Sequence, residues 1–441
     1  TITLRPDITF HDGSALDATV LKNNLDAYRG AYPTRQPLLF SFALSNIADV
    51  EVVDDLSVEV TTDDPWVAFP AALYSSGRLG IMAQAQLDAD TQECNTEPIG
   101  TGPFSFVSWT RDVDLKVQRN PDYWQEAPDG KPYPYLNAIE FRPVSNSDER
   151  LASLQRGDIN MMHTSTASDI AENLVTLRDA GEVNLLVSEE RTEITYAMMN
   201  TTVPPFDERR ARLAVARAID RDRINEVANR GFATIADGPF APGVLGYLDD
   251  PGFPAHDLAR AKAAVAEMEA EGVDTSIAIL ATTDPTVVRQ TSLVKEMLEE
   301  AGFEVRLEIE EQPDLIDRVI QGDYEAAAFR NQPGDDPDMD HVWWYGEGNP
   351  VNFGRFDDQV INDNLDKGRS TADRDARREA YEAINRRFAE QVYNVWLWYA
   401  PWAVAESPNV HGILGPDLPD GSEATARIVS GHPVLGVWIE S

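Results

Sequence analysis

The stretch SIAILATTDPTVVRQTSLVKEMLEEAGFEVRLEI, residues 276–309, decides the fold class. Its apolar residues predict a strand over 276–280, a helix over 285–301 and a second strand over 303–309. Gly302 stands where helices commonly end on a residue with positive φ. A strand, a helix and another strand in this order form a βαβ unit. The stretch therefore predicts a mixed α/β fold.

The rest of the chain also alternates between strand and helix patterns. Further strands are expected at 51–62, 103–119, 136–144 and 393–405, and further helices at 148–155, 207–227, 257–272 and 371–391. Asp207 and Asp257 are the expected N-caps of two of these helices, because an aspartate side chain can accept hydrogen bonds from free backbone N–H groups. A chain of 441 residues is longer than one core usually supports, so two or three domains are expected.

The chain is strongly acidic. With 75 Asp and Glu residues against 37 Lys and Arg residues, its formal net charge is −38. Non-specific nucleic-acid binding needs a basic face that displaces counterions, so no nucleic-acid partner is expected. Anionic membrane surfaces are disfavoured for the same electrostatic reason. The hydrophobic residues, 42% of the chain, can bury a large core, which argues against disorder.

Cysteine content and apolar runs narrow the class further. Cys94 is the single cysteine, which excludes an intramolecular disulfide framework and a cysteine-based zinc site. No run reaches the roughly 18 apolar residues that a membrane span requires. The chain begins at Thr1 inside a strand-like alternation, so we expect that upstream residues are absent from this sequence.

Four motifs follow one another along most of the chain. They are LRPDITFHDG at 4–13, PIGTGPF at 98–104 with RNPDYW at 119–124, the run from Met199-Asn200 through PFD at 205–207 to AIDR at 218–221, and GDY at 322–324 with Asp336-Pro337. In this order they resemble the family 5 solute-binding proteins of ABC importers, the oligopeptide, dipeptide and nickel group. Gly13 permits the positive φ of a tight turn and Asp12 can bond the following amides, so we interpret the motifs as scaffold.

The resemblance implies a two-lobed clamshell of the periplasmic-binding-protein type, class II, with an extra α/β subdomain. The expected parts are the subdomain at 1–95, lobe I at 96–192 continued by 406–441, and lobe II at 193–405, with hinges near 193–198 and 403–407. In this family lobe I begins with strands that precede the FHDG motif, and those strands are expected to be missing from this sequence.

The resemblance also implies a function. The expected protein lies outside the cytoplasm, in the periplasm or at the cell surface, and captures a small solute by hinge closure. It would then deliver the solute to the permease subunits of an ABC importer. It is expected to act as a monomer without a cofactor. Whether a lipid anchor precedes Thr1 is left open. A ligand sensor on the same fold is the alternative. A glycoside or peptide hydrolase is a weaker alternative, because the sequence has no catalytic motif and no catalytic residues are expected.

Candidate ligand residues gather in lobe II. Arg330 follows an apolar strand, where a guanidinium could clamp a carboxylate or phosphate, or pair with the acidic loop 335–340. Aromatic side chains suit cleft walls because each has a large rigid face and a polar edge. Alternation along 393–405 predicts one core face and one cleft face, and Trp398 is assigned to the cleft. The full set of candidates is Arg330, Asn331, Trp343, Trp344, Trp398, Asn352 and, near the hinge, Tyr196 in lobe II, together with Arg78 of the subdomain, which would face the cleft from the other side.

One departure from the family pattern bears on the ligand. The resemblance implies that peptide binders of this family carry an aspartate shortly before the Asp336-Pro337 motif, and that this aspartate binds the amino terminus of the peptide. Counting back from Asp336-Pro337 places Pro333 at that position. A ligand with a free α-amine is therefore disfavoured, while peptide-like, opine-like, sugar and chelate ligands stay open.

Metal binding is not expected. The acidic positions 1, 3, 5 and 12 of the segment 336–347 imitate a calcium loop. His341 stands where such a loop needs glycine, so we expect a solvated acidic turn instead. The six histidines show no paired ligand spacing, so no metal site is predicted.

Overall fold

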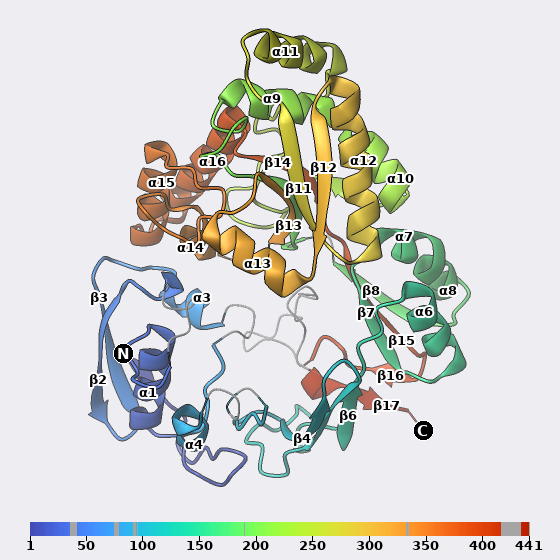
Figure 1. Cartoon of the computed structure of the whole chain (residues 1–441). Coiled ribbons are helices and arrows are strands. Elements are labelled where there is room, and N and C mark those ends of the chain that lie inside the picture. The colour runs from blue at the N-terminus through green and yellow to red at the C-terminus, as the bar shows by residue number, and fades with distance from the viewer. Residues whose placement is uncertain are drawn as a thin grey trace.

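The molecule has three parts, which Figure 1 shows together. The computed structural model describes residues 1–35, 42–74, 79–90, 94, 96–188, 190–331, 334, 336–415 and 434–440. A large mixed sheet with its helices forms lobe II, smaller sheets form lobe I, and the first hundred residues form the N-terminal subdomain. Lobe II lies at the top of Figure 1, the subdomain at the lower left and lobe I at the lower right. Among the helices in this described part, none has the length and apolar character needed to cross a membrane.

Lobe II is built around the large sheet. Its strands lie in the order β10 (Thr234–Ile235), β14 (Asn394–Tyr399), β9 (Ile194–Met199), β13 (Ala326–Asn331), β11 (Ser276–Thr282) and β12 (Glu304–Glu310). The strands β11 and β12 pair in parallel, and α12 (Pro285–Ala301) connects them, so the predicted βαβ unit is confirmed. Gly302 ends α12 with φ at 110°, as the sequence predicted.

Helices cover both faces of this sheet. One face carries α9 (Arg209–Ala218), α10 (Arg221–Asn229), α11 (Leu258–Ala270) and α12. The other face carries α13 (Gln312–Gln321), α14 (His341–Trp344), α15 (Gln359–Ser370) and α16 (Arg374–Gln391). Because each face is covered, β14 is buried at every residue. The expected division of this strand into a core face and a cleft face therefore does not hold.

The expected single helix 207–227 is two helices in the structure. The first ends because Ile219 adopts extended backbone, with φ −82° and ψ 111°. Asp220 then caps α10 by accepting a backbone hydrogen bond with its side chain. Glu208 stands at the N-cap of α9 without a capping bond, so the expected aspartate cap is wrong. Asp257 caps α11 as predicted.

Lobe I consists of small antiparallel sheets with helices beside them. Its sheets are, in strand order, β7 (Met161–Thr164), β15 (Trp402–Glu406) and β8 (Asn184–Ser188), then β4 (Phe104–Thr110), β5 (Asp114–Arg119) and β6 (Ala138–Phe141), and finally β16 (Val410–His411) and β17 (Trp438–Ile439). Its helices are α6 (Ser147–Arg156), α7 (Ala167–Asp169), a π-helical turn (Ile170–Leu174), α8 (Val175–Asp179) and a 3₁₀ turn (Val434–Gly436). Apolar residues of α6–α8 pack against β7 and β15, which forms the core of this lobe.

The chain crosses between the lobes twice. It leaves lobe I after β8 and enters lobe II at β9, and it returns between β14 and β15, so the expected strand 393–405 is two strands. Thr192 Oγ1 donates to the carbonyl of Ala400 at 2.6 Å, and the Ala400 amide donates to the carbonyl of Glu193 at 2.8 Å. These bonds hold the two crossings side by side. The hinges predicted near 193–198 and 403–407 lie next to them, and the lobe limits stay a prediction.

The N-terminal subdomain packs a small sheet against helices. Its strands lie in the order β1 (Ile2–Thr3), β3 (Ser57–Thr62) and β2 (Ile47–Asp54), and its helices are α1 (Ala18–Tyr28), α3 (Phe69–Tyr74) and α4 (Gln84–Asp88). β2 and β3 confirm the two strands predicted within 51–62. The subdomain is joined to lobe II through Asp338 in the 3₁₀ turn Pro337–Asp340. That carboxylate accepts hydrogen bonds from Trp66 Nε1 at 2.6 Å and Arg369 Nε at 2.8 Å.

Candidate functional site

Arg330 lies at the end of β13, where lobe II meets lobe I. The strand begins with buried alanines, and its burial pattern leaves the Arg330 side chain 42% exposed. The Nε atom pairs with Glu193 Oε2 at 2.9 Å, and Nη1 donates to Ser165 Oγ at 2.9 Å. Ser165 follows β7 of lobe I, so one guanidinium links the two lobes.

Glu193 and Trp402 complete this contact. Trp402 Nε1 donates to Glu193 Oε2 at 3.0 Å, so a single carboxylate oxygen accepts from an indole and a guanidinium. The Cζ atom of Arg330 lies 5.4 Å from the centroid of the Trp402 ring, and the His163 ring lies 4.4 Å from the same ring. We call His163, Ser165, Glu193, Arg330 and Trp402 the hinge cluster, because it surrounds the two crossings.

The hinge cluster leaves Arg330 able to bind a ligand. Its two contacts use two of the five N–H donors of a guanidinium. The remaining donors keep a planar arrangement that suits a carboxylate. The sequence left open a pairing of Arg330 with the loop 335–340, but the structure pairs it with Glu193 from the first crossing. A carboxylate at the hinge therefore fixes the orientation of the cation.

Three of the aromatic candidates lie in the core of lobe II. Trp398 is buried on the face covered by α9–α12. Trp344 is buried with its ring edge-on to Phe388, at a centroid distance of 5.0 Å. Tyr196 packs against Trp396 at 5.0 Å, and burial raises the pKa of its phenol, which stays neutral. In this structure these side chains stabilise the sheet, and we carry none of them into the proposed ligand contacts.

The remaining candidates differ in exposure. Trp343 is half-buried beside the aromatic cluster of lobe II. Asn331 is the last residue of β13 and is also half-buried. Asn352 is buried and donates to a backbone carbonyl four residues later at 2.7 Å, so it stabilises a turn. Arg78 and Pro333 lie outside the residues that the structure describes.

The acidic segment 336–340 is not the solvated turn that the sequence predicted. Asp338 and Asp340 are 1% and 0% exposed. Asp336 pairs with Arg377 Nη2 at 2.7 Å, so arginines from the helices α15 and α16 neutralise part of the segment. Burial raises the pKa of the Asp340 carboxyl, whose oxygens have no hydrogen-bond partner among the described residues. No cluster of acids, histidines or cysteines in the described ranges could hold a metal ion.

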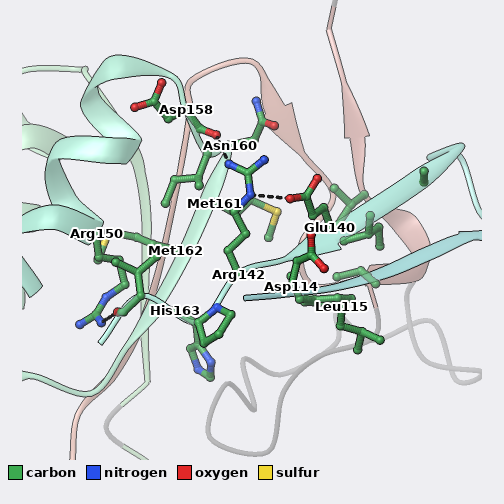
Figure 2. Close-up of a pocket in the computed structure, with 18 of the residues that line it drawn as sticks. Asp114, Leu115, Glu140, Arg142, Arg150, Asp158, Asn160, Met161, Met162 and His163 are labelled. Atoms are coloured by element: carbon green, nitrogen blue, oxygen red, sulfur yellow. Dashed lines mark hydrogen bonds and ion pairs between the residues drawn. The ribbon is translucent and has the colours of Figure 1, made fainter. Parts of the chain in front are cut away.

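A groove in lobe I is a second concave feature, which Figure 2 shows and which the sequence did not predict. It encloses about 820 Å³ between the outer edges of β6 and β7. Its walls are largely apolar and include Leu115 and Met161, and on the β6 side Arg142 Nε donates to Glu140 Oε1 at 2.6 Å. Its residues come from distant segments, so no local pattern marks it.

The groove and the hinge cluster meet at one residue. His163 lines the groove, and its ring also packs on Trp402 of the hinge cluster. The arginines of the groove, Arg142 and Arg150, already donate to Glu140 and to the Val144 carbonyl, whereas Arg330 on the hinge side keeps unused donors for a polar solute. The groove supplies mainly apolar surface. We therefore take the hinge cluster as the candidate ligand site.

Comparisons with known proteins agree with this architecture. The family model for bacterial extracellular solute-binding proteins, family 5 Middle, matches residues 1–353. A segment of 240 residues is 33% identical to the glutathione-binding protein GsiB of Pectobacterium atrosepticum, and it covers 54% of this chain and 44% of that protein. The Escherichia coli protein of the same name is 31% identical over 244 residues, 55% of this chain and 45% of the relative. The match thus spans less than half the length of these relatives.

Solved structures show the same fold. The binding protein AgaA from A. tumefaciens R10, solved in complex with agropinic acid, superposes with a TM-score of 0.85 at 26% identity. That match covers 100% of this chain and 86% of AgaA. The periplasmic binding protein DppA from Helicobacter pylori, solved with the peptide STSA, has a TM-score of 0.82 at 21% identity over the same shares. The predicted periplasmic-binding-protein fold is confirmed, and the chain belongs to the bacterial extracellular solute-binding proteins of family 5.

Proposed function

We propose that this protein captures a small carboxylate-bearing solute between its lobes and delivers it to the permease subunits of an ABC importer. The observation that carries the proposal is the exposed guanidinium of Arg330, which reaches from lobe II to Ser165 of lobe I. A ligand shifts the open–closed equilibrium only by the difference between its affinities for the two states. A cation that lies at the contact between the lobes is positioned to supply that difference.

The names of the relatives support an acidic solute. GsiB is named a glutathione-binding protein, and AgaA was solved with agropinic acid. Glutathione carries two carboxylates together with a free α-amine, the group that Pro333 disfavours, and agropinic acid is an acid by name. Of the ligand classes that the sequence left open, peptide-like and opine-like acids fit Arg330 best, because its guanidinium binds carboxylates in a planar, bidentate geometry.

Ligand binding would change one partner of Arg330. In the structure its Nη1 donates to the neutral hydroxyl of Ser165. A solute carboxylate offers an ionised acceptor, and hydrogen bonds to ionised groups are roughly twice as strong as neutral ones. Glu193 keeps the Nε side of the guanidinium oriented during this exchange. We propose Asn331 and the half-buried Trp343 as further contacts from lobe II.

The proposed role needs no chemistry on the solute. The protein would act as a monomer outside the cytoplasm, in the periplasm or at the cell surface, as the extracellular family description supports. Closure around the solute would create the surface that docks on the permease. Binding without turnover is therefore part of the proposal.

Titration calorimetry with glutathione and agropinic acid as probes tests this function. We expect saturable one-to-one binding of at least one probe, no turnover, and loss of binding when the carboxylates are esterified. A probe at 100 times its Kd should also raise the free energy of unfolding by about 2.7 kcal/mol. Native mass spectrometry of the purified protein would identify a co-purified solute.

Three results would count against the proposal. Equal affinity for the acids and their esters would show that carboxylates are not recognised. The absence of binding for both probes, together with a co-purified solute that lacks an acidic group, would exclude the proposed ligand class. Turnover of a probe would contradict the transport role.

A further inference from the structure

A cavity at the outer end of lobe II lies apart from the hinge cluster. It encloses about 360 Å³ between α9, the start of α11 and the end of α16. Figure 1 shows α9 and α11 at the top of the molecule, on the side of lobe II away from lobe I and the N-terminal subdomain. A ligand bound there would not touch the proposed solute site.

The helix α9 presents two arginines to this cavity. Arg209, Leu213 and Arg217 are spaced four apart, so they lie on one face of the helix. Arg209 Nε donates to the backbone carbonyl of Glu390 at 2.7 Å. Arg217 is half-buried, and its side chain has no hydrogen-bond or ion-pair partner among the described residues. A half-buried guanidinium without an acceptor has lost part of its hydration without compensation.

The start of α11 adds a third arginine and an imidazole. Arg260 and His256 line the cavity beside α9. The Nδ1 atom of His256 lies 3.8 Å from Asp220 Oδ2, which leaves its other ring nitrogen without a described contact. The helix α11 begins at this wall, because its cap Asp257 and its first-turn residue Arg260 both line the cavity.

The carboxylates of the cavity are already engaged. Asp257 caps α11 by accepting from the Arg260 amide at 3.0 Å, and its second oxygen lies 3.3 Å from Arg260 Nε. Glu390 pairs with Arg387 Nη1 at 2.7 Å. Neither carboxylate contacts Arg217, so the cation of α9 stays available.

We propose that this cavity binds a small anion with several oxygens, a phosphate or a carboxylate. Arg217 is the anchor, because a guanidinium can donate two parallel hydrogen bonds to such a group, and Arg209 and Arg260 flank it. The chain has a net charge of −38, but this cavity is lined by three arginines and two carboxylates, a local excess of positive charge that favours anions. A bound anion would connect α9 to α11 and stabilise the outer end of lobe II.

Calorimetric titration with sodium phosphate, and separately with citrate, tests this site at an ionic strength held constant with sodium chloride. We expect saturable binding of at least one anion, and Arg217→Gln should weaken it at least tenfold. Arg289→Gln is the matched control, because Arg289 is exposed on α12 and the substitution changes the net charge equally. Binding of phosphate alone identifies a phosphate ligand, and binding of citrate alone identifies a carboxylate ligand.

Folding of the variants is checked by their melting temperatures without anion. If Arg217→Gln is less stable than the wild type, Arg260→Gln replaces it, with an expected weakening of at least threefold. The proposal is overturned by absent saturation with both anions, or by equal weakening in Arg217→Gln and Arg289→Gln. Loss of anion binding in Arg330→Ala with full binding in Arg217→Gln would also overturn it, because the anion would then occupy the hinge cluster.

Discussion

Arg330 connects three segments that are far apart along the chain. Glu193 belongs to the first crossing, Trp402 to the strand that follows the second, and Ser165 to a loop of lobe I. The guanidinium is held on its Nε side by a charged partner and on its Nη1 side by a neutral one. A solute carboxylate could therefore replace the neutral partner while the charged partner stays in place.

Arg330→Ala should weaken binding of the carboxylate solute by about 10- to 100-fold, because a hydrogen bond to a charged group contributes about 1.5–3 kcal/mol. Arg330→Lys keeps the charge but loses the planar fork, so its affinity should be intermediate. Arg289→Ala, on the exposed side of α12, should leave the affinity unchanged. Titration calorimetry measures all three variants, and full affinity in Arg330→Ala would remove this residue from the site.

Glu406 makes the stability of lobe I depend on pH. It is buried on β15, its Oε2 has no hydrogen-bond partner among the described residues, and burial raises its pKa from 4.5 to about 7. Between these values the folded state binds more protons than the unfolded state, so the stability contribution of this group falls as pH rises from about 4.5 to 7.

Glu406→Gln should remove this dependence. The difference in free energy of unfolding between the variant and the wild type should rise from pH 5 to pH 8 by up to about 3 kcal/mol. Each pKa unit corresponds to about 1.4 kcal/mol. Urea unfolding at both pH values measures the gain. Glu182→Gln, on the surface of lobe I, is the control and should show no such trend. A gain that is the same at pH 5 and pH 8 would contradict the assignment to Glu406.

Among the elements of lobe II, α15 has one buried aspartate at its start that also contacts its neighbours. Asp358 caps α15 by accepting from the Val360 and Ile361 amides at 2.9 and 3.3 Å. Its other oxygen accepts from Arg387 Nε of α16 at 2.8 Å and from the Tyr393 hydroxyl, just before β14, at 2.7 Å. The same carboxylate therefore caps the start of α15 and joins it to α16 and to the residue before β14.

Asp358→Ala should lower the free energy of unfolding by about 2–5 kcal/mol, because it removes a cap, leaves the buried Tyr393 hydroxyl without its acceptor and takes from Arg387 one of its two carboxylate partners. Asp284→Ala provides the matched control, since Asp284 is an exposed cap of α12 with backbone contacts alone. Its cost should be about 1 kcal/mol. Urea denaturation of both variants measures the difference, and equal losses would show that the contacts to α16 and β14 contribute little.

Elements with strong local signals could be predicted, and those shaped by tertiary contacts could not. The limits of α12 follow from Pro285 at its start and Gly302 at its end. The break after α9 was missed because the apolar spacing continues through Ile219, although Asp220 is a capping residue that could have marked it. Alternation failed for Trp398, because helices cover both faces of β14 and bury every position.

The whole molecule could be assigned to its fold from motifs spread along most of the chain, since each motif fixes a local turn of the scaffold. The ligand site could be predicted only in part. Arg330 was identified by its place at a strand end, while Glu193 and Trp402 join it only after the lobes have folded. The groove between β6 and β7 and the cavity beside α9 likewise combine distant segments.

The central claim is hinge closure around a solute. It is tested most directly by measuring the distance between the lobes at increasing ligand concentration. Dyes on Thr176→Cys of α8 and Gln312→Cys of α13, both exposed positions, would report this distance by single-molecule energy transfer in a Cys94→Ser background. With saturating glutathione or agropinic acid, whichever binds, the distribution should shift to shorter distances, and Arg330→Ala should need a higher concentration for the same shift. An unchanged distribution at full occupancy would contradict hinge closure.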